Sequence, residues 1–507
     1  MNSSTLNKVK RGICKIQGVC RSHCWEQPYL LENEYEAGGT GFMVDPLLFG
    51  EKFTPEPGAR YLLTNFHVVQ NYSTRWCLLE WPERKNSFLS CKVKHVSPNL
   101  DVAILELNPA LPQPRWWEGD AVEWIASIPN CPLNTTEIIK GASQKIKSVG
   151  FPNLQSDYQI SDGSLSSRGL GMLQLDLSLN GGNSGGPLFL KNKVVGICTA
   201  AVSDSERLGL AVPIQEIFRF FTHWCEYEDV ILRLPCWGLR TQMLTEDYMA
   251  YKKIPHRGVL VKTVLSEQAC DTAGLKPNDI LLSITSGGKT YDVDTHGLVQ
   301  VDYTDKRVEL TSVEFVLNLT PDDIKVSYYR KKVHTTTVHL EPIEFKVRLR
   351  YPQYEAIEHC VFAGMTYTNL NLNNLEDSDD EEDDEPVMFD HSILNTLQET
   401  SGMENITICT HINAQSYVTY ASNMAENERL VKVNGTKVKD VKHLNTILDN
   451  VAKRYYAFKS DYVIFETNKG RNILSLDRLS EQERQDNQKY NYVGVLRLLR
   501  RRRKRKR

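Results

Sequence analysis

Short apolar and β-branched runs, separated by Gly, Pro and Asn, follow one another between about Gly38 and Val230. They include GTGFMV, YLLTNFHVV, DVAILEL, GMLQLDLSL and LGLAVPI. Many short strands at this spacing are typical of an all-β barrel. Near the end of the region, apolar residues fall at helical intervals in IQEIFRFFTHW, so we expect one helix to close it.

Two further regions combine strands with short helices. Residues 231–345 contain RGVLVKTVLSEQACDTAGLKPNDILLSI, which predicts a strand, a short helix, a turn and another strand. Residues 346–496 have a similar layout, with a hairpin signal at Asn434-Gly435 and an acidic insert at about 373–388. The chain therefore divides into an N-terminal extension (1–37), a β domain (38–230), two α+β domains (231–345 and 346–496) and a basic tail (497–507).

Composition places the chain in the ordinary globular range, with 507 residues, 41% hydrophobic and 24% charged. No apolar run approaches the roughly 20 residues that a membrane helix needs, and the first residues lack the apolar core of a signal peptide. These features predict a soluble intracellular protein of the nucleus or cytoplasm that makes no membrane contact. The twelve cysteines are expected to be thiols.

Although the formal net charge is only -3, the chain contains two segments of strong and opposite charge. The run Glu376 to Glu385 is acidic and Arg497 to Arg507 is almost wholly basic, so both are expected to be disordered. The basic tail is compatible with a nuclear address read by an import receptor, a nonspecific phosphate contact or a solubilising end. It contains no aromatic residue for stacking on bases.

One group of cysteine and histidine residues raises the question of a zinc site. Cys14, Cys20, His23 and Cys24 lie within eleven residues, CKIQGVCRSHC. Their spacing matches no standard zinc pattern, so free thiols are the preferred interpretation and no metal is predicted.

The segment LNGGNSGGPLFL surrounds Ser184 with glycines. Because a serine hydroxyl is a weak nucleophile, it needs a base, a group that orients the base and donors for an oxyanion. His67 and Asp101 supply the first two candidates. The bare backbone beside Gly182 and Gly185 lets N–H groups converge on a developing negative oxygen.

The sequence GNSGG also fits the G-x-S-x-G turn of α/β-hydrolases. In those enzymes a helix follows the serine, and the acid and histidine come later in the chain. Here a predicted β-hairpin follows Ser184 and the order is His, Asp, Ser, which favours the double-barrel protease arrangement.

Taken together, LTNFHVV, LDVAILEL, NGGNSGGPLF, VVGICTAAV and LGLAVPI strongly resemble the HtrA/Deg serine proteases, and GLKPNDILLSI resembles their PDZ domain. PRWWEGD, VDYTDKRVELTSVEFVL and FAGMTY are similar to the plant-type Deg branch, in which a second PDZ-like domain is divergent. The resemblance implies a mainly β protein, with a chymotrypsin-like double β-barrel followed by two PDZ-like α+β domains. No cofactor is implied.

The resemblance also implies roles for individual residues. His67 would be the general base, Asp101 its orienting carboxylate and Ser184 the nucleophile. The backbone N–H groups of Gly182 and Ser184 would bind the oxyanion, and Asp176 would have a structural role.

Departures from the family pattern bear on specificity. Phe66 replaces a small residue before the histidine, and Leu177-Ser178 replaces two alanines. The implied pocket is uncharged and predicts cleavage after Val, Ile, Ala or Leu; its residues are Ser178, Leu179, Thr199, Ala200 and Leu210.

The additional domains imply partners. Trp237, Gly238 and Leu239 stand where a PDZ domain grips the carboxylate of an apolar C-terminal peptide, although a glycine bulge at a strand start would look the same. The second PDZ-like domain, with a possible loop around Gly364, is expected to favour assembly, since the family forms trimers and multiples of trimers. The segment Asn153 to Gly171 is expected to be mobile, and we hypothesise that a peptide on the first PDZ domain orders it.

The leading interpretation is an ATP-independent serine endopeptidase that acts on misfolded or regulatory polypeptides. No GxxxxGK[ST] loop indicates a nucleotide motor. The alternative is a catalytically silent PDZ scaffold or holdase. Nucleic-acid binding depends on the basic tail alone.

Overall fold

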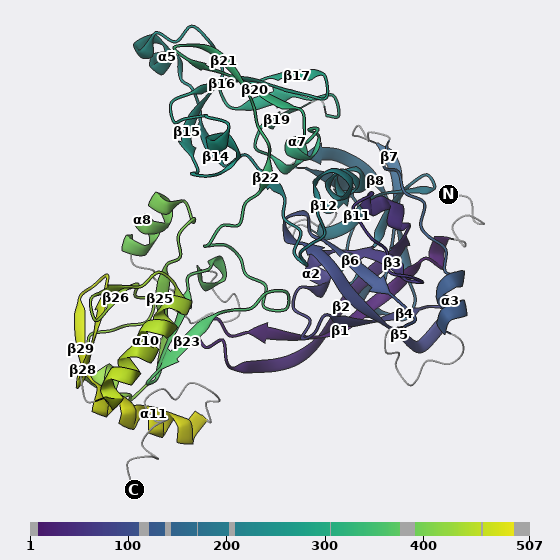
Figure 1. Ribbon diagram of the computed structural model, residues 1–507. Helices are drawn as coiled ribbons and strands as arrows, with labels where there is room; N and C mark the ends of the chain where they lie inside the picture. Colours follow the sequence, from purple (N-terminus) through teal and green to yellow (C-terminus); the bar gives the residue numbers. More distant parts are fainter. Residues whose placement is uncertain are drawn as a thin grey trace. The chain divides into compact units, whose positions relative to one another are not determined.

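A computed structural model describes residues 9–110, 121–136, 143–169, 171–201, 208–304, 306–375, 391–457 and 460–490 (Figure 1). The acidic insert from residue 376 onward and the basic tail lie outside the described residues. The chain forms two compact units: unit 1 is Met1–Arg21 with Glu34–Ile343, and unit 2 is Ser22–Asn33 with Glu344–Arg507. The domain boundaries given above remain predictions.

The first half of the predicted β domain is a closed six-stranded barrel in the order β1-β2-β3-β6-β5-β4 (Figure 1). Its strands carry many buried apolar side chains, and the charged residues Lys15, Glu80 and Glu106 of these strands are also buried. Its strands are β1 (Ile13–His23), β2 (Leu31–Val44), β3 (Arg60–Thr64), β4 (Trp76–Trp81), β5 (Arg84–Ser97) and β6 (Val102–Leu107).

Residues 13–23, assigned above to an N-terminal extension, form a barrel strand. A lysine interrupts the apolar pattern of this strand, since Lys15 lies between the buried Ile13 and Ile16. Lys15 is itself buried and forms an ion pair with the buried Glu80, its partner in the β1–β4 register. The pairing allows a charged side chain in the barrel wall, which the sequence pattern alone did not predict.

A second closed barrel has the order β10-β11-β12-β9-β8-β7. The helix predicted from IQEIFRFFTHW is confirmed as α4 (Ile214–Arg219), continued by a π-helical turn at Phe220–Trp224. The barrel strands are β7 (Gln144–Gly150), β8 (Gln159–Gly169), β9 (Met172–Asp176), β10 (Pro187–Leu190), β11 (Lys193–Ala201) and β12 (Leu208–Pro213). The mainly β, double-barrel prediction is confirmed.

Short helical segments connect the barrel strands: η1 (Pro46–Phe49), α2 (Phe66–Val69), η2 (Pro98–Leu100), α3 (Ala121–Ser127) and η3 (Pro152–Leu154). Of these, α2, η2 and η3 lie at the site described below.

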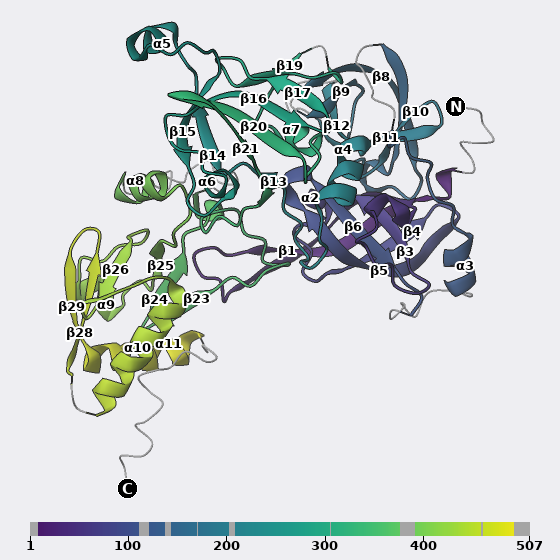
Figure 2. The ribbon, with the colours of Figure 1, turned by 45° about the horizontal axis from the view of Figure 1, so that its top comes forward.

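A mixed α+β fold follows within unit 1 (Figure 2). Its main sheet has the order β14-β15-β16-β20-β21, with β17 on β16, and β14 is an edge strand. The elements are β13 (Pro235–Cys236), β14 (Leu239–Gln242), α5 (Glu246–Lys252), β15 (Val259–Val264), α6 (Ala269–Thr272), β16 (Ile280–Ser286), β17 (Lys289–Asp292), β18 (Leu298–Gln300), β19 (Arg307–Glu309), α7 (Val313–Leu317), β20 (Ile324–Arg330), β21 (Lys332–Thr337) and β22 (Glu341–Pro342).

A buried ionic cluster joins this fold to the second barrel. Arg168 of β8 pairs with Glu216 of α4 and, through Nε at 3.2 Å, with Glu314 Oε1 of α7. All three side chains are buried, and α4 and α7 lie side by side (Figure 2). Burial raises the pKa of Glu216 to about 7 despite the neighbouring guanidinium.

Unit 2 contains two small sheets, in the orders β23-β24-β25 and β27-β26-β28-β29. The predicted Asn434-Gly435 hairpin is confirmed, because both residues have positive φ between paired Val433 and Thr436. The elements are β23 (His359–Phe362), β24 (Met365–Asn369), η5 (Leu372–Leu375), α8 (His391–Thr400), β25 (Thr407–Ile412), α9 (Tyr417–Ala421), β26 (Leu430–Val433), β27 (Thr436–Lys437), α10 (Val441–Tyr456), β28 (Tyr462–Thr467), β29 (Arg471–Ser475) and α11 (Leu476–Tyr490).

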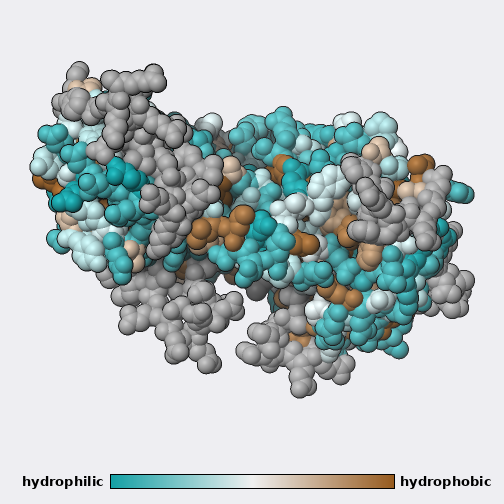
Figure 3. Space-filling model, turned by 90° about the horizontal axis from the view of Figure 1, so that it is seen from below, coloured by the Kyte–Doolittle hydropathy of each residue, from teal (hydrophilic) through white to brown (hydrophobic). Residues whose placement is uncertain are grey.

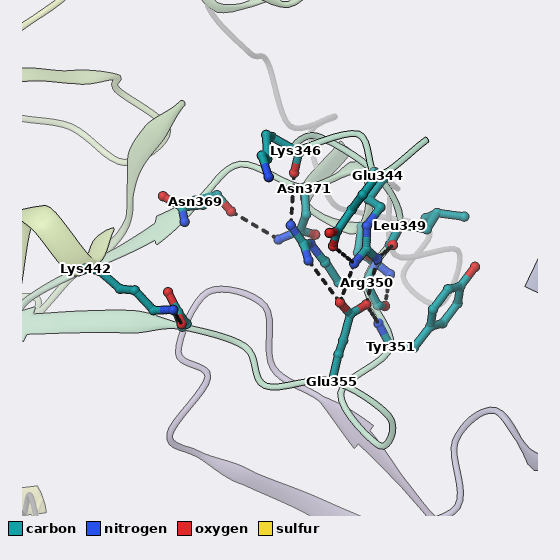
Figure 4. Close-up of polar contacts among 12 residues, drawn as sticks. Glu344, Lys346, Leu349, Arg350, Tyr351, Glu355, Asn369, Asn371 and Lys442 are labelled. Atoms are coloured by element: carbon teal, nitrogen blue, oxygen red, sulfur yellow. Dashed lines mark hydrogen bonds and ion pairs between the residues drawn. The ribbon is translucent and has the colours of Figure 1, made fainter. Parts of the chain in front are cut away.

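The start of unit 2 is held by an arginine–glutamate network (Figure 4). Arg348 donates two hydrogen bonds to Glu355, at 2.7 and 2.5 Å, and Arg350 Nη1 donates a third at 2.9 Å. Burial raises the pKa of Glu355, but the arginine hydrogen bonds outweigh it and hold the pKa below its ordinary value. Residues 22–33 also belong to this unit, where Thr410 Oγ1 donates to the Glu26 carbonyl at 2.8 Å.

On the face shown in Figure 3, hydrophobic residues appear as small separate groups among hydrophilic ones. Exposed apolar side chains of the first barrel include Val19 and Trp76, which are 43% and 39% exposed.

Candidate active site

His67 and Asp101 meet because of the register between two barrel strands. Thr64 of β3 pairs with Ala103 of β6, so the residues just after β3 and just before β6 lie at the same end of the barrel. His67 is on α2, and Asp101 follows η2 in a left-handed conformation with φ 51°. His67 Nδ1 lies 2.9 Å from Asp101 Oδ2, and the His67 backbone N–H donates to Asp101 Oδ1 at 3.0 Å.

Thr199 links this pair to Ser184. The Thr199 hydroxyl donates to Asp101 Oδ2, and the Ser184 hydroxyl donates to the Thr199 carbonyl at 2.9 Å. Among the described contacts, Ser184 makes no hydrogen bond to His67. The three residues predicted as the triad are therefore joined in one network through Thr199, which had been assigned only to the specificity pocket.

The glycines around Ser184 allow a close backbone approach. Gly182 has φ +92°, and a Cβ there would lie 2.2 Å from the Phe151 carbonyl oxygen. Gly185 has φ +83°, and a Cβ there would lie 2.1 Å from the Thr40 carbonyl oxygen. A larger residue at either position would displace the loop.

The carbonyl groups of Gly181 and Gly182 accept hydrogen bonds from other segments of the chain. The Asn153 N–H donates to the Gly181 carbonyl at 2.6 Å, and Thr40 Oγ1 donates to the Gly182 carbonyl at 2.7 Å. Within the described part of the chain, the N–H groups of Gly182 and Ser184 donate to no protein acceptor. Backbone N–H groups without a protein acceptor can bind an oxyanion.

Sequence reasoning missed two buried polar residues that support the site. Asn65 donates through Nδ2 to the Asp101 carbonyl at 2.8 Å and accepts from the Gly185 N–H at 2.6 Å. Thr40 accepts from the Phe151 N–H at 3.0 Å while donating to Gly182. The sequence offered two signals for these residues. Asn65 lies two positions before His67, and Thr40 lies in the glycine-rich segment GGTGF.

The residues of the predicted pocket lie in the second barrel. Leu179 is half-buried beside Gly209, where a Cβ would lie 3.0 Å from Leu179 Cδ1. Leu210 is half-buried and Ser178 is exposed, while the side chain of Ala200 lies outside the described part. Leu179 therefore packs against β12 at Gly209.

The predicted carboxylate loop of the first PDZ-like fold is well packed. Trp237 is buried and its Nε1 donates to the Leu310 carbonyl at 2.9 Å. Gly238 has φ +68°, and a Cβ there would lie 2.6 Å from Gln268 Cβ. Leu239 begins the edge strand β14. Packing alone thus accounts for the glycine, and β14 lies at the edge of its sheet.

The cysteines considered for zinc do not form a metal centre in the structure. Cys14 and Cys20 are buried in β1, and burial raises the pKa of both thiols. Across the described residues, no three ligating side chains gather closely enough to hold a metal ion.

Two models of known protein families match parts of this chain. A model of the trypsin-like peptidase domain matches residues 39–197, and a PDZ domain model matches residues 350–488. The chain therefore contains a trypsin-like peptidase domain and a PDZ domain. The α/β-hydrolase alternative is excluded, since β10 and β11 pair after Ser184 as a hairpin.

Relatives confirm the resemblance to the HtrA/Deg proteases. The putative protease Do-like 12, mitochondrial, of Arabidopsis thaliana is 23% identical over 442 residues, which cover 83% of this chain and 75% of that protein. The putative serine protease HhoB of Synechocystis is 28% identical over 286 residues, covering 50% and 64%. The solved structure of the HtrA-type protease AlgW with a decapeptide is 18% identical and has a TM-score of 0.45, covering 67% and 98%. The names of the Arabidopsis and Synechocystis relatives agree with the prediction of a serine endopeptidase.

None of the helices in the described residues is long and apolar enough to span a membrane.

Proposed function

We propose that this chain hydrolyses peptide bonds through His67, Asp101 and Ser184. The observation that carries the proposal is the hydrogen bond of 2.9 Å between His67 Nδ1 and Asp101. The neighbouring Ser184 loop presents two N–H groups that have no acceptor among the residues that the structure describes. In this arrangement Asp101 fixes the tautomer of His67, so that Nε2 is the basic nitrogen.

The chemistry follows from these positions. The Ser184 hydroxyl turns from the Thr199 carbonyl to His67 Nε2, which takes its proton as Oγ attacks the scissile carbonyl. The N–H groups of Gly182 and Ser184 stabilise the oxyanion. His67 then protonates the leaving amine, and water attacks the acyl-enzyme by the reverse proton path.

The substrates proposed are polypeptides, either misfolded or regulatory, cleaved without ATP after a small or medium aliphatic residue. The predicted pocket residues Ser178, Leu179, Thr199, Ala200 and Leu210 are uncharged, which supports this preference, because a basic side chain would form no ion pair with them. Casein hydrolysis by the wild type, and its loss in Ser184→Ala with an unchanged circular dichroism spectrum, tests the function. Equal hydrolysis by both proteins would reject it.

A peptide-binding role is proposed for the first PDZ-like fold. The edge strand β14 can take an apolar C-terminal peptide as an added strand, with its carboxylate near Trp237, Gly238 and Leu239. Because α7 of the same fold contacts Arg168 of β8, bound peptide would bias the segment 153–171 toward its active arrangement. Titration of the full chain with such a peptide, read as kcat, tests this step.

Two further proposals concern assembly and location. We propose that the chain forms a homo-oligomer, a trimer or a multiple of a trimer, to which the second PDZ-like domain contributes. Light scattering of the chain with and without residues 346–496 tests this proposal.

The tail Arg497–Arg507 is proposed as a nuclear signal. The location in the cell of a fluorescent fusion with and without the tail tests this proposal.

One observation favours a second candidate, the catalytically silent scaffold or holdase. Ser184 bonds the Thr199 carbonyl in place of His67. A silent protein would suppress aggregation of an unfolded client equally well as wild type and as Ser184→Ala, and would hydrolyse none of it.

A further inference from the structure

A short linker joins the second barrel to the first PDZ-like fold. It comprises residues 225–234, between the π-helical turn that continues α4 and the first residue of β13. The Val96 N–H of β5 donates to the Val230 carbonyl at 2.8 Å, and the Leu232 N–H donates to the Val96 carbonyl at 2.7 Å. Val96 and Ile231 thus form a parallel bridge, which adds the linker to β5 of the first barrel.

A buried histidine of β5 makes the next contact with the linker. His95 is 7% exposed, and its Nδ1 lies 2.9 Å from the Asp229 carbonyl oxygen. Because a carbonyl oxygen can only accept, Nδ1 carries the hydrogen of this bond. Burial lowers the pKa of His95, which favours the neutral ring. The side chain of β5 therefore holds the linker one residue before the paired segment begins.

Tyr227 fixes the start of the linker. Its hydroxyl donates to the Phe49 carbonyl at 2.8 Å and to the Phe221 carbonyl at 3.2 Å. Its ring centroid lies 5.3 Å from that of His95 and 5.1 Å from that of Phe53. The ring of His95 is thus packed against one linker residue and hydrogen-bonded to another.

The end of β5 that holds the linker leads directly to Asp101. Ser97, the last residue of β5, pairs with Val102, the first residue of β6. The turn between these two strands consists of η2 and Asp101. The Asp101 N–H donates to the Pro98 carbonyl at 3.1 Å and closes the turn. Because the turn is so short, a displacement of the end of β5 would move Asp101 with it.

The conformation of Asp101 depends on this support. Its φ of 51° is left-handed, which is uncommon for a residue with a side chain and persists only where neighbouring contacts hold it. From this conformation Asp101 Oδ1 accepts from the His67 backbone N–H at 3.0 Å, and Oδ2 lies 2.9 Å from His67 Nδ1. Both contacts depend on the direction of one carboxylate, so a small shift of the turn would weaken both.

We propose, on the basis of the proposed function, that His95 is a positioning residue for the predicted catalytic acid. By bonding Asp229 it holds the linker on β5, and the paired linker fixes the strand end from which Asp101 orients His67. The linker continues through two residues after Leu232 into β13, so the same contact ties the first PDZ-like fold to the acid. Loss of the contact should slow turnover without weakening substrate binding, because the acid acts on the base.

The kinetic test replaces His95 with Leu and with Asn. Leu removes the donor, whereas the Asn amide can place an N–H near the position of Nδ1. We expect kcat of His95→Leu to fall about 3- to 10-fold with KM within about twofold of the wild type, and His95→Asn to recover most of the loss. The control His296→Leu makes the same change at an exposed histidine between β17 and β18 and should keep wild-type kinetics. An unchanged kcat in His95→Leu, or an equal loss in His95→Asn, overturns the positioning role.

Hydrogen exchange separates this inference from the proposed function, because it requires no hydrolysis. Mass spectrometry compares the backbone amides of residues 97–103 in Ser184→Ala and in Ser184→Ala/His95→Leu. We expect exchange in this turn to become at least about threefold faster, while β16 of the first PDZ-like fold exchanges at an unchanged rate. That result supports the inference even if the wild type cleaves no peptide.

Equal exchange in the turn of both proteins, or faster exchange throughout the chain, overturns the inference. If circular dichroism shows that His95→Leu does not fold, Tyr227→Phe takes its place in both tests. This variant keeps the ring against His95 and removes the hydroxyl that bonds the Phe49 carbonyl. The same local change in exchange and the same fall in kcat are then expected, and the absence of either contradicts the inference.

Discussion

The Ser184 hydroxyl donates to the Thr199 carbonyl, with the two oxygen atoms 2.9 Å apart. Thr199 thus contacts two members of the predicted triad, since its own hydroxyl donates to Asp101 Oδ2. A resting serine in this position must rotate toward His67 before it can attack. Catalytic hydrogen bonds commonly tighten only when substrate binds, so this geometry is compatible with an active enzyme.

The Thr199 hydroxyl should matter more for turnover than for substrate binding. In Thr199→Val, Asp101 loses a charge-assisted hydrogen bond of about 1.5–3 kcal/mol, so we expect kcat to fall roughly 10- to 100-fold with little change in KM. Steady-state kinetics on a peptide substrate measure this. Thr199→Ser keeps the hydroxyl and should restore most of the rate, and an equal loss in both variants would contradict the role.

Leu179 should limit the size of the residue accepted before the scissile bond. Its Cδ1 approaches the backbone at Gly209, so Leu179→Ala opens space in the pocket. We expect kcat/KM for a substrate with Phe at this position to rise about tenfold relative to one with Ala. Profiling matched peptides with both proteins measures the change, and Leu190→Ala, outside the predicted pocket, serves as the control. An unchanged ratio would remove Leu179 from the pocket.

Glu216 should make unit 1 less stable as pH rises. Its pKa is about 7 in the folded protein against an ordinary value of 4.5, so the folded state holds a proton that the unfolded chain loses. The stabilisation is complete below about pH 4.5 and is lost as pH rises through about 7. Glu216→Gln removes this dependence, which thermal unfolding at several pH values from 4.5 to 8 measures.

The control for this prediction is Glu226→Gln, the same chemical change at a glutamate whose side chain is 67% exposed. It should keep the pH dependence of the wild type. A wild-type slope that persists in Glu216→Gln would show that other groups cause it.

The fold and the predicted triad were accessible from sequence because their signals are local. Apolar runs separated by turn residues predicted the barrels, and glycines beside Ser184 marked a loop with unusual backbone angles. His67 and Asp101 could be paired only through the order of the motifs. Their contact depends on the β3–β6 register, which could not be predicted from the sequence.

Other features could not be predicted because they depend on contacts between distant segments. Lys15 looks like a surface residue until Glu80 is placed beside it in the neighbouring strand. Thr40 and Asn65 are ordinary polar residues until Gly182 and Gly185 lie against them. A buried polar residue is recognised by its partner, and the partner is known only from the fold.

The most direct test of the account is covalent labelling of the purified full chain with a fluorophosphonate probe, followed by mass spectrometry of the labelled peptide. We expect the label on Ser184 alone, no label in Ser184→Ala, and a rate at least 100-fold lower in His67→Ala because the hydroxyl loses its base. Absence of label on wild-type Ser184, or an equal labelling rate in His67→Ala, would contradict the proposed serine protease mechanism.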